Sequence, residues 1–217
     1  FEAPVTLHND ADAGLIGERF YAANPPENMA YLTISTGIGA GVAVDGEVLS
    51  GVEGNAAEVG HFVVEPGGLF CGCGGEGHWE AYCAGTSIPQ HARSLHESEG
   101  IQSNLSLDVA EFGAADVFAA VGEDPLADRT VEACTRYNAI GVANIVHAFA
   151  PETIYVGGAV ARNNAELVVD PLQERVADRV MTTAPEIRVT SLGDETVVRG
   201  ALAAAIITAT EDRTLAD

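Results

Sequence analysis

The chain has 217 residues, and 47% of them are hydrophobic, which is enough to bury a sizeable core and excludes a disordered chain. Its formal net charge is −22; ten arginines carry all the fixed positive charge, and lysine is absent. Nucleic acids and anionic membranes both bind clustered basic side chains, so this composition argues against either partner. No apolar run is long enough to cross a bilayer.

The excess of acidic residues predicts a folded protein from a halophile, in which a high-salt cytoplasm screens the repulsion between surface charges. Two of the four cysteines form the pair Cys71-x-Cys73, a spacing that favours a metal site over a disulfide framework. We therefore expect a cytoplasmic location. The chain begins at Phe1 without a methionine, and we expect it to be one part of a longer protein.

Apolar periodicity and turn residues predict strands and one helix in the first quarter of the chain. Asn9 or Asp10 can cap the helix, and Asp45-Gly46 is a two-residue hairpin signal. The expected elements are a short strand over 4–7, a helix over 12–23, a buried strand over 30–35, a glycine turn over 36–41, and strands over 42–44 and 47–49.

The rest of the chain predicts a glycine-rich loop, a helical block and a second α/β unit. The expected elements are the loop over 67–77, helices over 87–149 with short loops near 99–100 and 123–125 and the longest helix at 127–150, a strand over 153–156, a helix over 164–180, a strand over 187–190 and a helix over 196–210. This order predicts an α/β fold, with a helical insertion over about 87–150 in one domain. A parallel sheet would place the ligand site at the carboxyl ends of its strands.

Asp10 follows the first predicted strand and opens the first helix, so that its side chain can project into a cleft. A carboxylate there can accept the proton of a sugar hydroxyl as that oxygen attacks a phosphoryl group, and the amide of Asn9 can hold the same sugar. The alternative is that one of the two residues only caps the helix. The residues alone leave both interpretations open.

Glycines mark two candidate phosphate sites. In the turn over 36–41, Gly37 and Gly39 permit a close backbone approach to an anion, and Thr36 adds a hydroxyl donor. A tight turn without a ligand is the alternative. Gly157-Gly158 follows a predicted strand and can accept the phosphates or the adenine of a nucleotide, or simply turn the chain into a helix.

The segment 61–78 predicts a zinc site, because zinc prefers four soft or borderline ligands in a tetrahedron. A loop with so few apolar residues cannot hold its shape by packing, and a bound metal would supply that stability. Free buried thiols are the alternative. Cys83 is a rival fourth ligand, but a helix starting near Trp79 would turn it away. The expected ligands are His61, Cys71, Cys73 and His78.

Glu58 and Glu80 lie on either side of this loop, and two convergent acids can accept hydrogen bonds from sugar hydroxyls. Solvated surface acids are the alternative for each of them. Cys134 lies in a helical pattern and is expected in the core. The remaining histidines have no matching partners and are expected on the surface or in the core: His8, His91, His96 and His147.

Five segments together resemble the ROK family of sugar kinases and sugar-responsive repressors, and the resemblance runs over essentially the whole chain. They are Asn9-Asp10-Ala11-Asp12-Ala13, Thr36-Gly37-Ile38-Gly39-Ala40-Gly41, Glu58-Val59-Gly60-His61, the segment from Cys71 to Glu80, and the segment from Pro151 to Gly158. The resemblance implies an actin-like ATPase fold, similar to ribonuclease H. It also implies Asp10 as general base, with the other site residues as ligands: Asn9, Asp10, Glu58, His61 and Glu80 for the sugar, and Thr36, Gly37, Gly39, Gly157 and Gly158 for the nucleotide.

The resemblance implies a glucokinase, or a kinase for a related hexose, that uses ATP with Mg²⁺, carries structural zinc and forms a homodimer. The sequence departs from the family pattern at His78, where the family has a cysteine. It also lacks the Asp-x-Gly-x-Thr motif of the N-terminal lobe. We therefore expect residues 1–217 to be the C-terminal, larger lobe, with little activity alone. A sugar-sensing repressor and a zinc-stabilised dimerisation module remain as alternatives.

Overall fold

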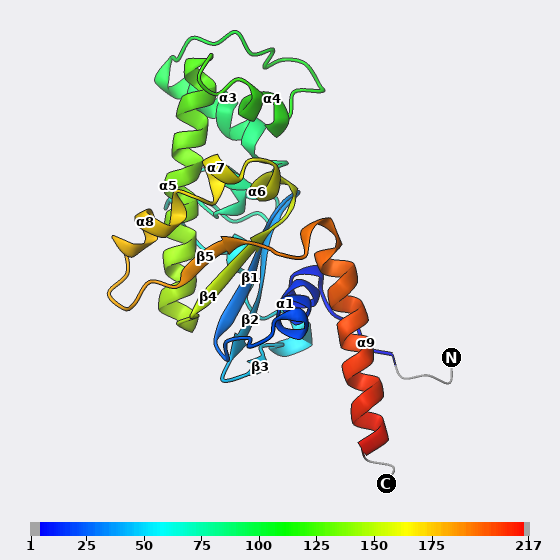
Figure 1. Ribbon diagram of the computed structural model, residues 1–217. Coiled ribbons are helices and arrows are strands. Elements are labelled where there is room, and N and C mark those ends of the chain that lie inside the picture. Colours follow the sequence, from blue (N-terminus) through cyan, green and yellow to red (C-terminus); the bar gives the residue numbers. More distant parts are fainter. Residues whose placement is uncertain (1–4, 215–217) are drawn as a thin grey trace.

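The computed structural model describes residues 5–214 of the chain, and side chains over residues 5–210. A five-stranded sheet with the order β3-β2-β1-β4-β5 forms its centre (Figure 1). The strands are β1 (Met29–Ile34), β2 (Ile38–Val44), β3 (Glu47–Val48), β4 (Thr153–Gly157) and β5 (Glu186–Val189). The first three pair antiparallel, whereas β4 pairs parallel with both β1 and β5. This mixed α/β sheet agrees with the predicted fold class.

Strand β1 separates two hydrophobic layers, because alternate residues of a strand face opposite sides of the sheet. Leu32 and Ile34 belong to the larger core, which includes α5 (Pro125–Phe149). Met29 and Tyr31 face the other way, toward α1 (Asp10–Tyr21). Helix α9 (Thr196–Thr214) packs along α1 on that same side (Figure 1).

Six further helices contribute buried residues to the larger core. They are α2 (Glu80–Cys83), α3 (Ile88–Glu99), α4 (Ala114–Ala119), α6 (Ala159–Asn163), α7 (Ala165–Val168) and α8 (Leu172–Ala177). Helices α3 and α4 lie together at one end of α5, away from β3 (Figure 1). No helix among residues 5–214 has the length and hydropathy that a membrane crossing requires.

Trp79 anchors the start of α2 to the large core. Its side chain is fully buried, and its indole N–H donates a hydrogen bond to Asn138 Oδ1 of α5 at 2.8 Å. A buried indole needs a partner for its N–H, and Asn138 supplies one. The residue that follows, Glu80, is therefore held at a fixed place beside the sheet.

Two predictions for the first part of the chain were wrong. Residues 5–7 form no strand, and residue 4 lies outside the described residues. The glycine turn predicted over 36–41 is confined to Ser35, Thr36 and Gly37, because β2 begins at Ile38. Gly39 and Gly41 therefore belong to a strand, where they pair with Thr33 and Tyr31 of β1.

Two helical predictions also need correction. The loop expected near 99–100 is present but longer than predicted, an irregular segment over 100–113, and the helix expected over 164–180 is two short helices, α7 and α8. Pro171 separates these two, because proline lacks the N–H that a continuous helix needs and its ring clashes with the preceding turn. The longest predicted helix is confirmed as α5, which begins two residues earlier than expected.

Candidate functional site

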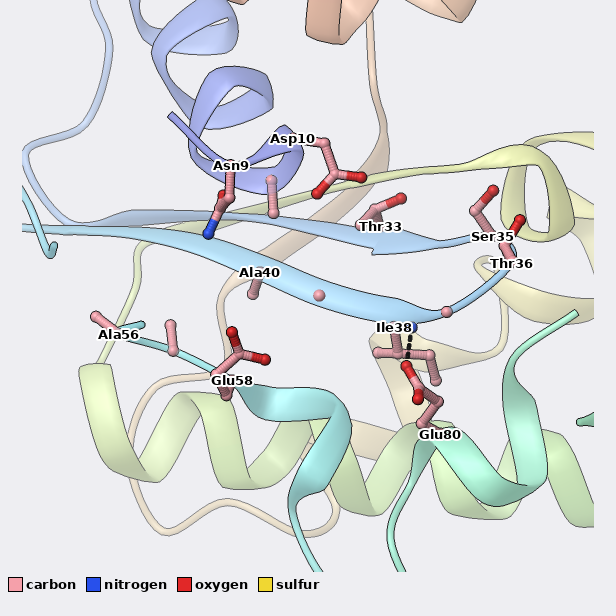
Figure 2. A pocket seen from close by; sticks show the side chains of 14 residues that line it. Asn9, Asp10, Thr33, Ser35, Thr36, Ile38, Ala40, Ala56, Glu58 and Glu80 are labelled. Carbon is pink, nitrogen blue, oxygen red and sulfur yellow. Dashed lines mark hydrogen bonds between the residues drawn. The ribbon is translucent and has the colours of Figure 1, made fainter. Parts of the chain in front are cut away.

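A cavity of about 310 Å³ opens between the first turn of α1 and the β1–β2 hairpin (Figure 2). Residues 56–58 and the start of α2 close its other side. The cavity therefore lies at the carboxyl end of β1, as expected for an α/β sheet. It brings together seven of the predicted site residues: Asn9, Asp10, Thr36, Gly37, Gly39, Glu58 and Glu80.

Asn9 is the residue that caps α1. Its Oδ1 accepts a hydrogen bond from the backbone N–H of Asp12 at 2.6 Å, which satisfies one of the free donors of the first turn. The carboxylate of Asp10 is left without a capping role and is exposed to the cavity. Figure 2 shows this carboxylate and the amide nitrogen of Asn9 both directed toward the space above β2. Asn9 therefore caps α1 through its Oδ1 and still presents its amide nitrogen to the cavity, whereas Asp10 does not cap the helix.

Gly41 allows the first turn of α1 to lie directly on β2. A Cβ atom at this position would stand 2.5 Å from the carbonyl oxygen of Ala11, closer than non-bonded atoms approach. Any larger residue would push the helix off the strand. Because Asp10 directly precedes Ala11, Gly41 sets the distance of the carboxylate from the hairpin.

The hairpin turn places backbone groups opposite Asp10. The N–H of Ser35 donates to the carbonyl of Gly37 at 2.9 Å, and the hydroxyl of Thr86 donates to the carbonyl of Thr36 at 2.8 Å. Thr33 and Ser35 also line the cavity, although the sequence analysis did not select them. Their alternation near the end of a buried strand was the available signal, since residues two apart share one face.

Gly157 and Gly158 lie outside this cavity. Gly158 has φ +87°, and a Cβ atom there would stand 2.4 Å from the carbonyl oxygen of Ile34, so glycine is required for the chain to leave β4 beside β1. Helix α6 follows directly and borders a second cavity of about 390 Å³. Its lining is mainly apolar and includes Phe118 of α4 and Val160 of α6.

The four expected metal ligands converge. One ligand atom from each of them lies within 4.8 Å of all the others: His61, Cys71, Cys73 and His78. Cys71 Sγ is 3.8 Å from His61 Nδ1, and Cys73 Sγ is 3.2 Å from His78 Nδ1. Zinc bonds of about 2.3 Å to sulfur and 2.1 Å to nitrogen would place such atoms about 3.6 Å apart in a tetrahedron. Two thiols and two imidazoles at these distances fit zinc.

The rival ligand Cys83 points away from this cluster. It is buried in α2 and donates its S–H to the carbonyl of Cys134 at 3.5 Å. Cys134 is buried in α5, as predicted. Of the histidines expected on the surface or in the core, His91 is buried, His96 is partly buried, and His8 and His147 are exposed.

Hydrogen bonds hold the segment between the ligands, and a few of its apolar residues, Phe62, Val64 and Leu69, pack in or against the large core. The N–H of Cys71 donates to the carbonyl of Gly75 at 2.8 Å, and the N–H of Leu69 donates to the hydroxyl of Tyr82 at 2.6 Å. Phe70 is 73% exposed. Burial raises the pKa of the Cys71 thiol, so a metal must displace a proton to bind there.

Glu80 connects the hairpin with the metal cluster. Its Oε2 accepts the backbone N–H of Ile38 at 2.9 Å (Figure 2), and its Oε1 lies 4.0 Å from Cys71 Sγ. The side chain of Glu58 has no hydrogen-bond partner in the described chain, and Figure 2 shows it facing the cavity. His61 does not line the cavity; it lies with the metal ligands three residues after Glu58.

Residues 1–208 match the model of the ROK family. The chain belongs to the ROK family. It is 36% identical to a glucokinase of Pyrobaculum calidifontis, over 94% of this chain and 66% of that protein, and 38% identical to a glucokinase of Aeropyrum pernix, over 94% and 67%. It thus spans about two thirds of these ROK relatives.

Solved ROK structures share this fold. The ROK hexokinase of Thermus thermophilus superposes with a TM-score of 0.80 at 35% identity, covering 96% of this chain and 67% of that one. The ROK glucokinase of Streptomyces griseus, solved with glucose and AMPPNP, gives a TM-score of 0.72 at 31% identity, covering 91% and 67%. The chain therefore has the actin-like fold of ROK sugar kinases.

Proposed function

We propose that the complete protein transfers the γ-phosphoryl group of ATP to a hydroxyl of glucose or a related hexose, with Asp10 as general base. The observation that carries this proposal is the position of Asp10. Its carboxylate does not cap α1. It shares one polar cavity with the sugar-ligand candidates Asn9, Glu58 and Glu80 and with the glycine turn. The glucokinase relatives support the same reaction.

In this proposal Asn9, Glu58 and Glu80 orient the hexose by hydrogen bonds to its hydroxyls. Asp10 accepts the proton of the reactive hydroxyl as its oxygen bonds to the γ-phosphorus, and the bond from that phosphorus to the bridging oxygen of ADP breaks. Backbone N–H groups of the turn at Thr36 and Gly37 face the transferred group and stabilise its charge. Mg²⁺ accompanies ATP as part of the substrate.

The adenosine of ATP is proposed to lie beyond Gly158. This glycine allows close backbone approach at the start of α6, and the neighbouring cavity offers Phe118 and Val160 as apolar surface for a purine ring. Gly157 is buried against Tyr31 inside the sheet. We therefore assign Gly157 a supporting part and Gly158 the contact with nucleotide.

Zinc is proposed to be structural. Its four ligands stabilise the loop over 61–78, and this loop fixes both Glu58, which precedes it, and Glu80, which follows it. No step of phosphoryl transfer requires this zinc ion. His61 would hold the metal directly and reach the sugar only at the cavity edge.

We further propose that the chain is the C-terminal lobe of this kinase, with residues of an N-terminal lobe completing the nucleotide cleft. The coverage of about two thirds of the relatives supports this arrangement. The chain alone should then show little turnover. The four free thiols support a reducing, cytoplasmic setting, and a homodimer is the expected assembly.

A sugar-responsive repressor is the second candidate. The xylose repressor of Bacillus subtilis is 27% identical over 92% of this chain and 50% of that protein. A sensor needs a sugar site but no general base. The carboxylate of Asp10, which faces the cavity without capping the helix, is available as a base and therefore favours the kinase.

The test is sugar-dependent ADP formation by the complete protein, with a panel of hexoses, in molar KCl to suit a net charge of −22. The kinase proposal predicts turnover that Asp10→Asn abolishes. Asp108→Asn is the matched control, because this exposed aspartate lies outside both cavities and makes no hydrogen bond or ion pair in the described chain. Sugar binding without turnover would contradict the kinase and favour the repressor.

A further inference from the structure

A third cavity, of about 560 Å³, continues the proposed sugar site on the far side of Asn9 and Glu58. These two residues line both cavities, whereas Thr36 and Gly37 of the hairpin turn line only the first. A ligand held beside Asp10 can therefore extend into the third cavity at the end remote from the turn. The remaining lining is polar except at Leu7: His8, Asp12, Ser50, Glu53, Gly54 and Asn55.

Asp12 is the unusual member of this lining. The residue is only 7% exposed, and its carboxylate has no hydrogen bond or ion pair in the described chain. Buried carboxylates are normally paired, because leaving one without donors costs free energy. The Asp12 carboxylate therefore presents unused acceptor atoms to the third cavity.

The charges around Asp12 are mostly of the same sign. Burial raises the pKa of the Asp12 carboxyl, His8 lowers it in part, and Asp10 and Glu58 raise it further. Glu53 adds a third carboxylate to the cavity lining, and no described arginine lies in it. A cationic group in this space would offset the desolvated charge of Asp12, whereas a neutral hydroxyl would supply a hydrogen bond alone.

We propose that the third cavity is a subsite for the ammonium group of an amino-hexose, with Asp12 as its anionic partner. The ammonium supplies three N–H donors to a cavity whose acceptors include Asp12, Glu53 and Asn55. This inference rests on the proposed function, because it takes the hexose ring to occupy the cavity beside Asp10. It narrows the substrate class to hexoses that carry a free amino group. This group lies on the part of the ring that faces Asp12 when the reactive hydroxyl is beside Asp10.

The test is calorimetric titration of the complete protein in molar KCl. The probes are glucose, the amino-deoxyglucoses with nitrogen at carbon 2, 3 or 4, and their N-acetyl derivatives. We expect one amino sugar to bind at least tenfold more tightly than its neutral N-acetyl derivative and more tightly than glucose. If every amino sugar binds no better than glucose, the subsite is refuted while the hexose site stands.

Asp12→Asn keeps the size of the side chain and removes its charge. We expect this variant to reduce the ratio of amino-sugar affinity to glucose affinity about tenfold, whereas the matched Asp108→Asn leaves the ratio unchanged. A ratio that survives Asp12→Asn overturns the assignment of Asp12. If that variant fails to fold, the preference of the wild-type protein for an amino sugar over glucose still decides the proposal. If glucose itself fails to bind, the proposed function is overturned instead.

Discussion

The two sides of the proposed sugar cavity are held in place by different forces. On the helix side, defined as α1 with β1 and β2, Leu15, Met29 and Leu32 are completely buried, and α1 packs directly on the strand at Gly41. On the loop side, defined as residues 58–80, Val59 and Trp79 are buried in the large core at the two ends, but between them Phe70 is 73% exposed, and four convergent ligands and backbone hydrogen bonds hold the chain. Burial thus positions Asp10, whereas the loop side depends on bonds that a chelator or one substitution can remove.

Removal of the metal should destabilise the loop side far more than the helix side, and this is the largest difference that we expect. Structural zinc contributes an apparent free energy of about 10 kcal/mol or more to small metal-bound folds. We expect chelation to abolish hydrogen-exchange protection in residues 61–80 while β1 and β4 keep theirs. His78→Gln should reproduce this loss, and His147→Gln, at an exposed histidine of α5, should not. Equal loss of protection on both sides would contradict the comparison.

Gly41→Ala should damage the helix side. The added Cβ would meet the carbonyl of Ala11 at 2.5 Å, and such overpacking costs about 3 kcal/mol of unfolding free energy. Gly39→Ala is the matched control in the same strand, because its Cβ would make only ordinary contacts at 3.6 and 3.7 Å. Urea unfolding measures both. If the two variants lose the same stability, close packing of α1 is not what positions Asp10.

Asp124 stabilises the helix that supports both sides, since α5 carries the partner of Trp79. It is 4% exposed and caps α5 through the N–H groups of Leu126 and Ala127, and it also accepts hydrogen bonds from Ser103 and from the N–H of Asn104. Burial raises its pKa, but these hydrogen bonds outweigh burial and lower the pKa below the usual value. Asp124→Ala should cost about 2 kcal/mol at pH 7.

The pH dependence of this loss follows from the lowered pKa. The stabilisation by Asp124 is fully present above the pKa of an unfolded aspartate, 3.8, and is lost as the pH falls through the lower folded value. The difference in unfolding free energy between wild type and Asp124→Ala should therefore shrink at strongly acidic pH. Asp124→Asn should keep much of the cap and lose the pH-dependent part. A difference independent of pH would contradict this assignment.

The smallest expected effect concerns the backbone next to Glu58. Ala57 has φ +56°, a left-handed conformation that costs a non-glycine residue about 1 kcal/mol. Ala57→Gly should raise the unfolding free energy by a few tenths to about 1 kcal/mol, since glycine's own entropy cost offsets part of the gain. Ala56→Gly, at a residue without positive φ, should lower it. Thermal unfolding distinguishes the two, and destabilisation by both variants would show that Ala57 stores no strain.

The sequence predicted those site features that depend on short segments. Asp10 at the start of α1 and the cluster of His61, Cys71, Cys73 and His78 each follow from residues close in the chain, so their spacing already limits where they lie. The break in the helix over 164–180 was also predictable from the sequence, because Pro171 lies inside that range. The apolar periodicity of this range predicts one continuous helix only if Pro171 is disregarded.

Features that depend on packing between distant segments were not predictable from spacing. The burial of Asp12 depends on the packing of α1 on β2, where a Cβ atom at Gly41 would stand 2.9 Å from the Cα of Asp12. The separation of Gly158 from the cavity beside Asp10 likewise follows from the position of β4, which pairs parallel with β1 on the side away from β2. Side-chain accessibility at such points is set by tertiary contacts and not by local pattern.

The most direct test of the account compares kcat and KM for Asp10→Asn and His78→Gln in the complete protein. The account predicts that Asp10→Asn lowers kcat about a thousandfold with KM for hexose nearly unchanged, since it removes the base and keeps the binding groups. His78→Gln should instead raise KM, because the loop side orients the sugar. Retention of kcat within tenfold in Asp10→Asn would contradict the central claim that this carboxylate takes the proton.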